Sequence, residues 1–183
     1  DREVIEHVRD KLLSYGHEII PDLEQAWESN FNAQVQSRIE DLIHSLQFSQ
    51  LKDNIITWKE KEQDDLLRGM YLIASYQYPD LSFDDLKAQI EQLFYEVWLN
   101  FKDAKTPTDQ IRLINDVLFN KIRLGANTKN FHAPANSMLN IVLESKKGNP
   151  ISLCVIYILV AQRLKIPVYG VNLPNLFILT YKS

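Results

Sequence analysis

Residues 148–161 read GNPISLCVIYILVA and carry the strongest structural signal in the sequence. Asn149 followed by Pro150 is a typical helix start, because Asn accepts from a free backbone N–H and Pro occupies a first-turn position that needs no donor. Every residue from 151 to 161 is aliphatic, aromatic or sulfur-bearing except Ser152. A helix that is apolar all round has no face for solvent. We therefore expect other elements to enclose this helix.

The sequence on either side of this helix predicts a mostly α protein. Two runs rich in β-branched and aromatic side chains follow it, at 168–171 and 176–181, and predict a short β-hairpin or two strands. Upstream, apolar residues recur at helical spacing and Lys146-Lys147-Gly148 predicts a turn. The expected helices cover residues 4–12, 19–27, 35–46, 51–58, 66–74, 83–101, 107–122 and 136–144. We expect an antiparallel helical bundle or HEAT-like arm over residues 1–125, followed by an α+β lobe from residue 126, because 125–134 is the longest irregular segment.

One stretch of the amino-terminal arm resembles a HEAT-type helical repeat. Ile20, Pro21, Leu23 and Arg38 stand at the positions where such repeats carry a Pro in one helix and an Arg in the next. Only one copy is recognisable, and an irregular helical bundle explains the same pattern equally well. Both alternatives stay open at this point.

Composition and charge exclude several classes of function. The 183 residues hold 24 acidic and 20 basic side chains, which gives a net charge of −4, whereas a nucleic-acid-binding surface needs a basic stripe. The uncharged stretch before Arg163 has too few apolar residues to span a bilayer. One cysteine, Cys154, forms no internal disulfide and favours a reducing, cytoplasmic location. No His/Cys cluster has metal-ligand spacing, and we expect no cofactor.

The chain begins at Asp1 and ends at Ser183, just after the second expected strand. We therefore expect the native protein to continue at both ends, with more sheet beyond the carboxyl terminus. The sequence does not indicate an oligomeric state.

Four segments resemble a known family. They are ASYQYPDL at 74–81, NSMLNIVL at 136–143, GNPISL at 148–153 and VNLPNLF at 171–177. Together they look like the bacterial transglutaminase-like family often labelled SirB-like, over roughly residues 66–182. The resemblance implies a partial transglutaminase-like α+β lobe over residues 126–183. In active transglutaminases a cysteine at the start of the central helix is the nucleophile, and a histidine on a following strand is the base.

This chain departs from that catalytic pattern at both positions. Pro150 stands where the family's nucleophilic cysteine is expected, and Leu176 stands in place of the histidine in the family's Pro-Gly-His-Phe pattern. Neither side chain can attack a carbonyl or accept a proton. The resemblance therefore implies a non-catalytic transglutaminase-like module that binds a protein or peptide and uses neither nucleic acid nor membrane. Its cleft is expected to be lined by Asn136, Ser152, Asn172 and Asn175.

Two other interpretations stay open. A hydrolase or transamidase with a relocated nucleophile would use Cys154 or Ser152, with His132 as the available base. Cys154 lies one helical turn deeper than the expected nucleophile, and burial there predicts an inert thiol with a raised pKa. Alternatively, residues 1–125 form a helical protein-interaction scaffold and the carboxyl-terminal lobe only supports it.

Overall fold

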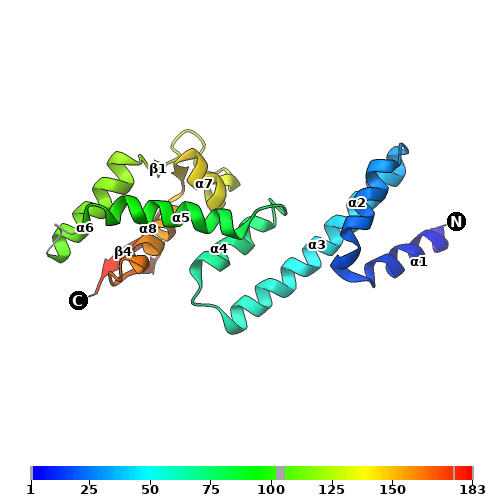
Figure 1. Ribbon diagram of the computed structural model, residues 1–183, viewed down its shortest axis with the longest axis horizontal. Helices are drawn as coiled ribbons and strands as arrows, with labels where there is room; N and C mark the ends of the chain where they lie inside the picture. The colour runs from blue at the N-terminus through cyan, green and yellow to red at the C-terminus, as the bar shows by residue number, and fades with distance from the viewer. Residues whose placement is uncertain (1, 102–105, 175, 183) are drawn as a thin grey trace. The chain divides into compact units, whose positions relative to one another are not determined.

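The computed structural model describes residues 2–101, 106–174 and 176–182 (Figure 1). Its contacts divide the chain into two compact units, Asp1–Gln63 and Asp64–Ser183. The division therefore lies well before the predicted boundary at residue 125. The reason is that the helices between residues 66 and 121 share one hydrophobic core with the central apolar helix.

The first unit consists of helices alone. They are α1 (Arg2–Leu13), η1 (Gly16–Ile19), α2 (Ile20–Ser29) and α3 (Ala33–Lys61). The side chain of Asn32 caps α3 by accepting from the backbone N–H of Gln34 at 2.9 Å. The stretches predicted as separate helices over 35–46 and 51–58 form one helix, because residues 47–50 contain no Gly or Pro that would end it. The HEAT-type repeat stays a prediction.

The second unit contains most of the helices and all the described strands. Its helical elements are α4 (Leu66–Ser75), α5 (Phe83–Trp98), α6 (Pro107–Asn115), the π-helix η3 (Asp116–Lys121), η4 (Pro134–Ser137), α7 (Leu139–Ser145) and α8 (Pro150–Arg163). Ser82 caps α5 and Thr106 caps α6, since each side chain accepts from the backbone N–H three residues on. The helix predicted over 136–144 is instead divided at Met138, which separates η4 from α7.

Two small sheets accompany these helices. The predicted hairpin is present as β3 (Val168–Leu173) and β4 (Leu176–Tyr181), antiparallel with Asn172 opposite Phe177. A second, parallel pair joins β1 (Gly125–Ala126) to β2 (Lys147–Gly148) and was not predicted, because two-residue strands leave no periodic pattern. Of the three residues expected to form a turn at 146–148, the last two therefore belong to β2.

Helix α8 is the centre of the second unit. Residues 155–161 are at most 7% exposed, and they pack against α5, which crosses α8 in Figure 1. The ring of Tyr157 stacks on Phe119 with centroids 6.3 Å apart. The prediction of a central apolar helix is confirmed from residue 155 onward. In its first turn the side chain of Ile151 is 54% exposed, whereas Ser152 is buried.

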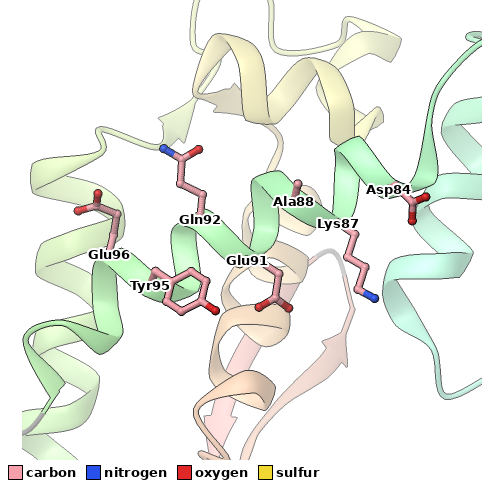
Figure 2. A pocket seen from close by; sticks show the side chains of 7 residues that line it. All are labelled: Asp84, Lys87, Ala88, Glu91, Gln92, Tyr95 and Glu96. Carbon is pink, nitrogen blue, oxygen red and sulfur yellow. The ribbon is translucent and has the colours of Figure 1, made fainter.

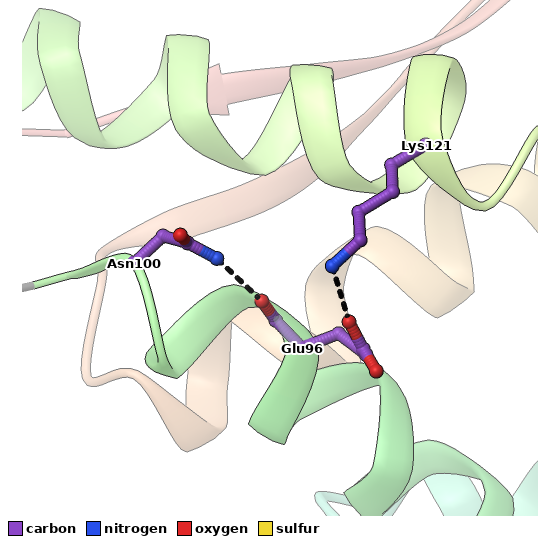
Figure 3. Close-up of polar contacts among 3 residues, drawn as sticks. All are labelled: Glu96, Asn100 and Lys121. Carbon is purple, nitrogen blue, oxygen red and sulfur yellow. Dashed lines mark hydrogen bonds and ion pairs between the residues drawn. The ribbon is translucent and has the colours of Figure 1, made fainter.

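Ion pairs link side chains on the surface of α5 to neighbouring helices. Lys121 of η3 contacts Glu96 at 2.6 Å, and Asn100 donates to the main-chain carbonyl of Glu96 (Figure 3). Arg163 at the end of α8 contacts Glu91 at 2.6 Å. These contacts orient the outer helices around α8. None of the described helices is long and apolar enough to cross a membrane.

Candidate functional site

The start of α8 is held by a reciprocal pair of hydrogen bonds. The Asn149 side-chain oxygen accepts from the backbone N–H of Ser152 at 2.8 Å, and the Ser152 hydroxyl accepts from the backbone N–H of Asn149 at 3.1 Å. This arrangement satisfies two backbone donors that a helix start otherwise leaves free. Gly148 precedes it, and an added Cβ there would lie 2.5 Å from the Ser152 oxygen. The backbone before α8 therefore needs glycine for this close approach.

A buried asparagine links this helix start to the preceding loop. The Ser152 hydroxyl donates to the main-chain carbonyl of Asn136 at 2.8 Å, and both residues are at most 3% exposed. The Asn136 amide donates in turn to the carbonyls of Asn130 and Phe131. Its own oxygen accepts from the side chain of Asn127 at 2.9 Å. The loop over 127–136 is thus tied to the first turn of α8.

A cleft of about 500 Å³ opens above these buried bonds. Three parts of the chain line it: the segment at 131–137, the helix start at 149–151, and the adjoining ends of β3 and β4. Among the described residues, its lining includes no lysine, arginine, aspartate or glutamate. The lining residues are Phe131, His132, Ala133, Pro134, Ser137, Asn149, Pro150, Ile151, Asn172, Leu173, Leu176 and Phe177.

The structure places in this cleft the two residues that the sequence comparison sets in place of a nucleophile and a base. Pro150 on α8 and Leu176 on β4 both line it, although 25 residues separate them in the sequence. Asn172 lines it as well, as predicted. Asn136 and Ser152 do not, because they are buried in the polar network that supports the cleft. Asn175 lies outside the described residues.

The candidates for a relocated nucleophile and base do not form a catalytic pair. His132 is exposed and lines the cleft, with its ring edge against Phe131 at 5.3 Å between centroids. Cys154 is not among the lining residues, and it is partly buried rather than fully buried. Burial raises the pKa of the Cys154 thiol, which keeps it protonated. The Ser152 hydroxyl is engaged in the helix cap and bound to Asn136.

Several lining residues were not anticipated from the sequence. Phe131, Ile151, Leu173 and Phe177 are apolar, and apolar residues are assigned to the core by default. Their place in the sequence could have identified them, because each lies within two residues of a segment that resembles the family or of His132. The ring of Phe177 also packs over Gly170, where an added Cβ would collide with it.

A second pocket lies on α5 and is a weaker candidate for a functional site. Figure 2 shows seven α5 side chains that line this volume of about 510 Å³. Two of them, Glu91 and Glu96, already form ion pairs with Arg163 and Lys121. A surface that takes its lining from one helix has no opposing wall to hold a ligand. No group of three His, Cys, Asp or Glu that could hold a metal ion is found in the described part of the chain.

Comparisons with known proteins identify relatives of this chain. The sequence profile of a family described as the transglutaminase-like superfamily matches residues 84–183. A UPF0162 protein of Xylella fastidiosa (strain 9a5c) is 36% identical over 129 residues, which cover 68% of this chain and 44% of that protein. F-box only protein 21 of Mus musculus is 24% identical over 164 residues, covering 76% of this chain and 26% of that protein. The chain thus spans less than half the length of these relatives. No solved structure matches it significantly.

Proposed function

This chain belongs to the transglutaminase-like superfamily, and from that membership we propose that it is a non-catalytic member that binds a protein or peptide in the cleft at the start of α8. The observation that carries the proposal is the shared position of Pro150 and Leu176. Both line one cleft, at the two places where active relatives hold a nucleophile and a base. We therefore infer that this chain retains the cleft but lacks the nucleophile and the base.

The residues that remain cannot replace those groups. Proline has no ionisable side chain, and leucine cannot accept a proton. The Ser152 hydroxyl lies beneath the cleft in the helix cap, and the partly buried Cys154 lies outside the cleft lining. Members of a catalytic triad act as a unit, so the loss of one removes most of the rate. The proposal therefore assigns binding, rather than turnover, to the cleft.

The lining indicates the chemistry of the bound segment. Ile151 and Leu176 are each 54% exposed, and Phe131 is 49% exposed, so the cleft offers apolar surface to solvent. Burying such surface favours an apolar side chain by roughly 25 cal/mol per Å². A charged side chain would find no lysine, arginine, aspartate or glutamate among the described lining residues. We propose an uncharged peptide segment with an apolar anchor, whose backbone amides bond to Asn172.

The remaining parts of the proposal follow from the sequence. They are a SirB-like family label, a cytoplasmic location and a protein partner instead of nucleic acid or membrane. The scaffold alternative assigned the function to residues 1–125, but that range spans both compact units. The cleft is the stronger candidate because it is built within one unit.

Peptide binding to matched variants tests the proposal. An array of peptides is screened with the full chain, and the affinity of each selected peptide is measured by calorimetry. We expect Leu176→Asp to weaken binding at least tenfold, because it places a charge in the apolar cleft. Leu99→Asp is the control, since Leu99 is 67% exposed and does not line the cleft. Peptides that bind Leu176→Asp as well as the wild type would contradict the proposed site.

Turnover assays test the non-catalytic part separately. The protein is incubated with glutamine-donor peptides and amines, and with peptidase substrates, and the products are analysed by mass spectrometry. We expect the substrates to be unchanged. Turnover that disappears on Ser152→Ala or Cys154→Ala would overturn the proposal in favour of a relocated nucleophile.

A further inference from the structure

The first unit carries an apolar groove that the proposed function does not use. It lies between α1 and α3 and encloses about 620 Å³. Val4 and Val8 of α1 face it and are 57% and 49% exposed. Ile39 and Leu42 of α3 form part of its opposite wall. A contiguous exposed apolar surface of this kind is typical of an interaction site.

The hydrophobic core of this unit is small, which is a second reason to expect another molecule to cover the groove. Its cluster of buried hydrophobic residues, within the described range 2–63, contains Leu23, Ile39, Leu42 and Leu46. A unit of about 60 residues with so few buried side chains gains little stability from its core. Two of these four residues also line the groove, so a cover would extend the same core.

The charged side chains at the groove indicate which molecule covers it. Glu6 and Arg9 line the groove from α1, and Arg38 and Asp41 line it from α3. Arg38 and Asp41 stand three residues apart, on neighbouring helix positions. Within the described residues neither forms an ion pair. If two copies of α3 cross antiparallel about a two-fold axis near residues 39 and 40, Arg38 of each copy lies opposite Asp41 of the other. A two-fold interface requires this self-complementarity, and an unrelated partner does not.

We propose that a second copy of this chain docks on the α1–α3 groove. The two grooves face each other across a two-fold axis, so the apolar walls bury one another. Two Arg38–Asp41 pairs form across the interface. Thirteen residues line the groove, about half of the roughly 20–30 residues that each side of a standard interface supplies. The interface is therefore smaller than a standard one, and the dimer is reversible.

Self-association of apolar variants provides the first test. Sedimentation velocity of the full chain across micromolar concentrations should show a monomer–dimer equilibrium. We expect Val8→Asp to raise the dissociation constant at least tenfold while its far-ultraviolet circular dichroism stays unchanged, because Val8 is half-exposed in the monomer. Phe31→Asp is the control, since Phe31 is 97% exposed and lies outside the groove lining. A wild-type protein that stays monomeric, or a Val8→Asp dimer as strong as the wild type, overturns the proposal.

A charge exchange tests the two-fold geometry. Arg38→Asp and Asp41→Arg each place like charges opposite one another in their own homodimers, and we expect both variants to be monomers. An equimolar mixture of the two variants pairs opposite charges at both positions, so it should form a heterodimer of at least wild-type affinity. Homodimers of either variant as strong as the wild type, or a mixture that stays monomeric, overturn this arrangement. Dimerisation and peptide binding are measured on separate variants, so the failure of one proposal is distinguishable from the failure of the other.

Discussion

The hydroxyl of Ser152 donates a hydrogen bond of 2.8 Å to the main-chain carbonyl of Asn136, sixteen residues earlier in the chain. Both residues are buried, and each belongs to a wider set of hydrogen bonds. Ser152 caps α8, and Asn136 holds the carbonyls of the preceding loop. The bond between them therefore joins two walls of the cleft, and the serine is a structural residue at this site.

Replacing Ser152 by Ala should destabilise the protein by about 2 kcal/mol. The variant loses half of the helix cap and a buried hydrogen bond to Asn136, each of which contributes on the order of 1 kcal/mol. Urea unfolding followed by circular dichroism measures the loss. Ser29→Ala is the matched control, because the Ser29 hydroxyl is exposed and bonds only within α2. Equal and negligible effects of the two substitutions would contradict the structural role of Ser152.

Gly148→Ala should cost more stability than Gly125→Ala. An added Cβ at Gly148 would lie 2.5 Å from the Ser152 oxygen and 2.8 Å from a methyl of Val142, so the start of α8 would have to shift. At Gly125 the nearest atom is the flexible Lys147 ammonium at 3.4 Å, which moves easily. Urea unfolding of both variants gives the comparison. A Gly148→Ala variant as stable as the wild type would show that this close approach is absent.

The phenol of Tyr157 should make the protein less stable at high pH. Burial raises the pKa of Tyr157 to about 12 from its ordinary value of 10. Below pH 10 the phenol is protonated in both states. Between pH 10 and pH 12 the unfolded state releases the proton while the folded state still holds it, so unfolding becomes more favourable.

The Tyr157→Phe variant lacks this phenol, so it should not show this part of the loss of folding stability at alkaline pH. Urea unfolding is compared below pH 10 and between pH 10 and 12, with Tyr95→Phe as the control because Tyr95 is 55% exposed. We expect Tyr157→Phe to lose less stability than the wild type over this range, and Tyr95→Phe to behave as the wild type does. Identical pH dependence in all three proteins would contradict the effect of burial.

Cys154 should react slowly with iodoacetamide in the native protein. Burial raises the pKa of the thiol and disfavours the reactive thiolate. The alkylation rate, followed by mass spectrometry, should increase at least tenfold in denaturing urea at the same pH. A native rate equal to the unfolded rate would instead identify an accessible thiol and favour the relocated nucleophile.

The central part of the second unit could be predicted from the sequence because its signals are local. Asn149 and Pro150 identify the start of α8, and the apolar run behind them predicts burial. The strand predicted over 176–181 forms with those bounds. Each of these features depends on a few adjacent residues with a strong conformational preference.

The parts that the sequence did not reveal depend on contacts between distant residues. Amide and hydroxyl side chains were expected to face a cleft, but Asn136 and Ser152 bond to each other across sixteen residues and are buried. Ile151 belongs to the apolar run, yet its side chain is exposed where the cleft opens. The predicted boundary at residue 125 lies between α5 and α8, yet these two helices pack on each other across 51 intervening residues, and a sequence pattern does not contain that pairing.

The reactivity of an installed thiol tests most directly whether residues 150 and 176 face one another in the cleft. The Pro150→Cys variant is compared with Pro150→Cys combined with Leu176→His, each in a Cys154→Ala background, by iodoacetamide alkylation as a function of pH. A nearby imidazolium stabilises a thiolate, so we expect alkylation of the combined variant to begin at lower pH than that of the single variant. Identical pH profiles for the two variants would contradict the shared cleft on which the proposed function rests.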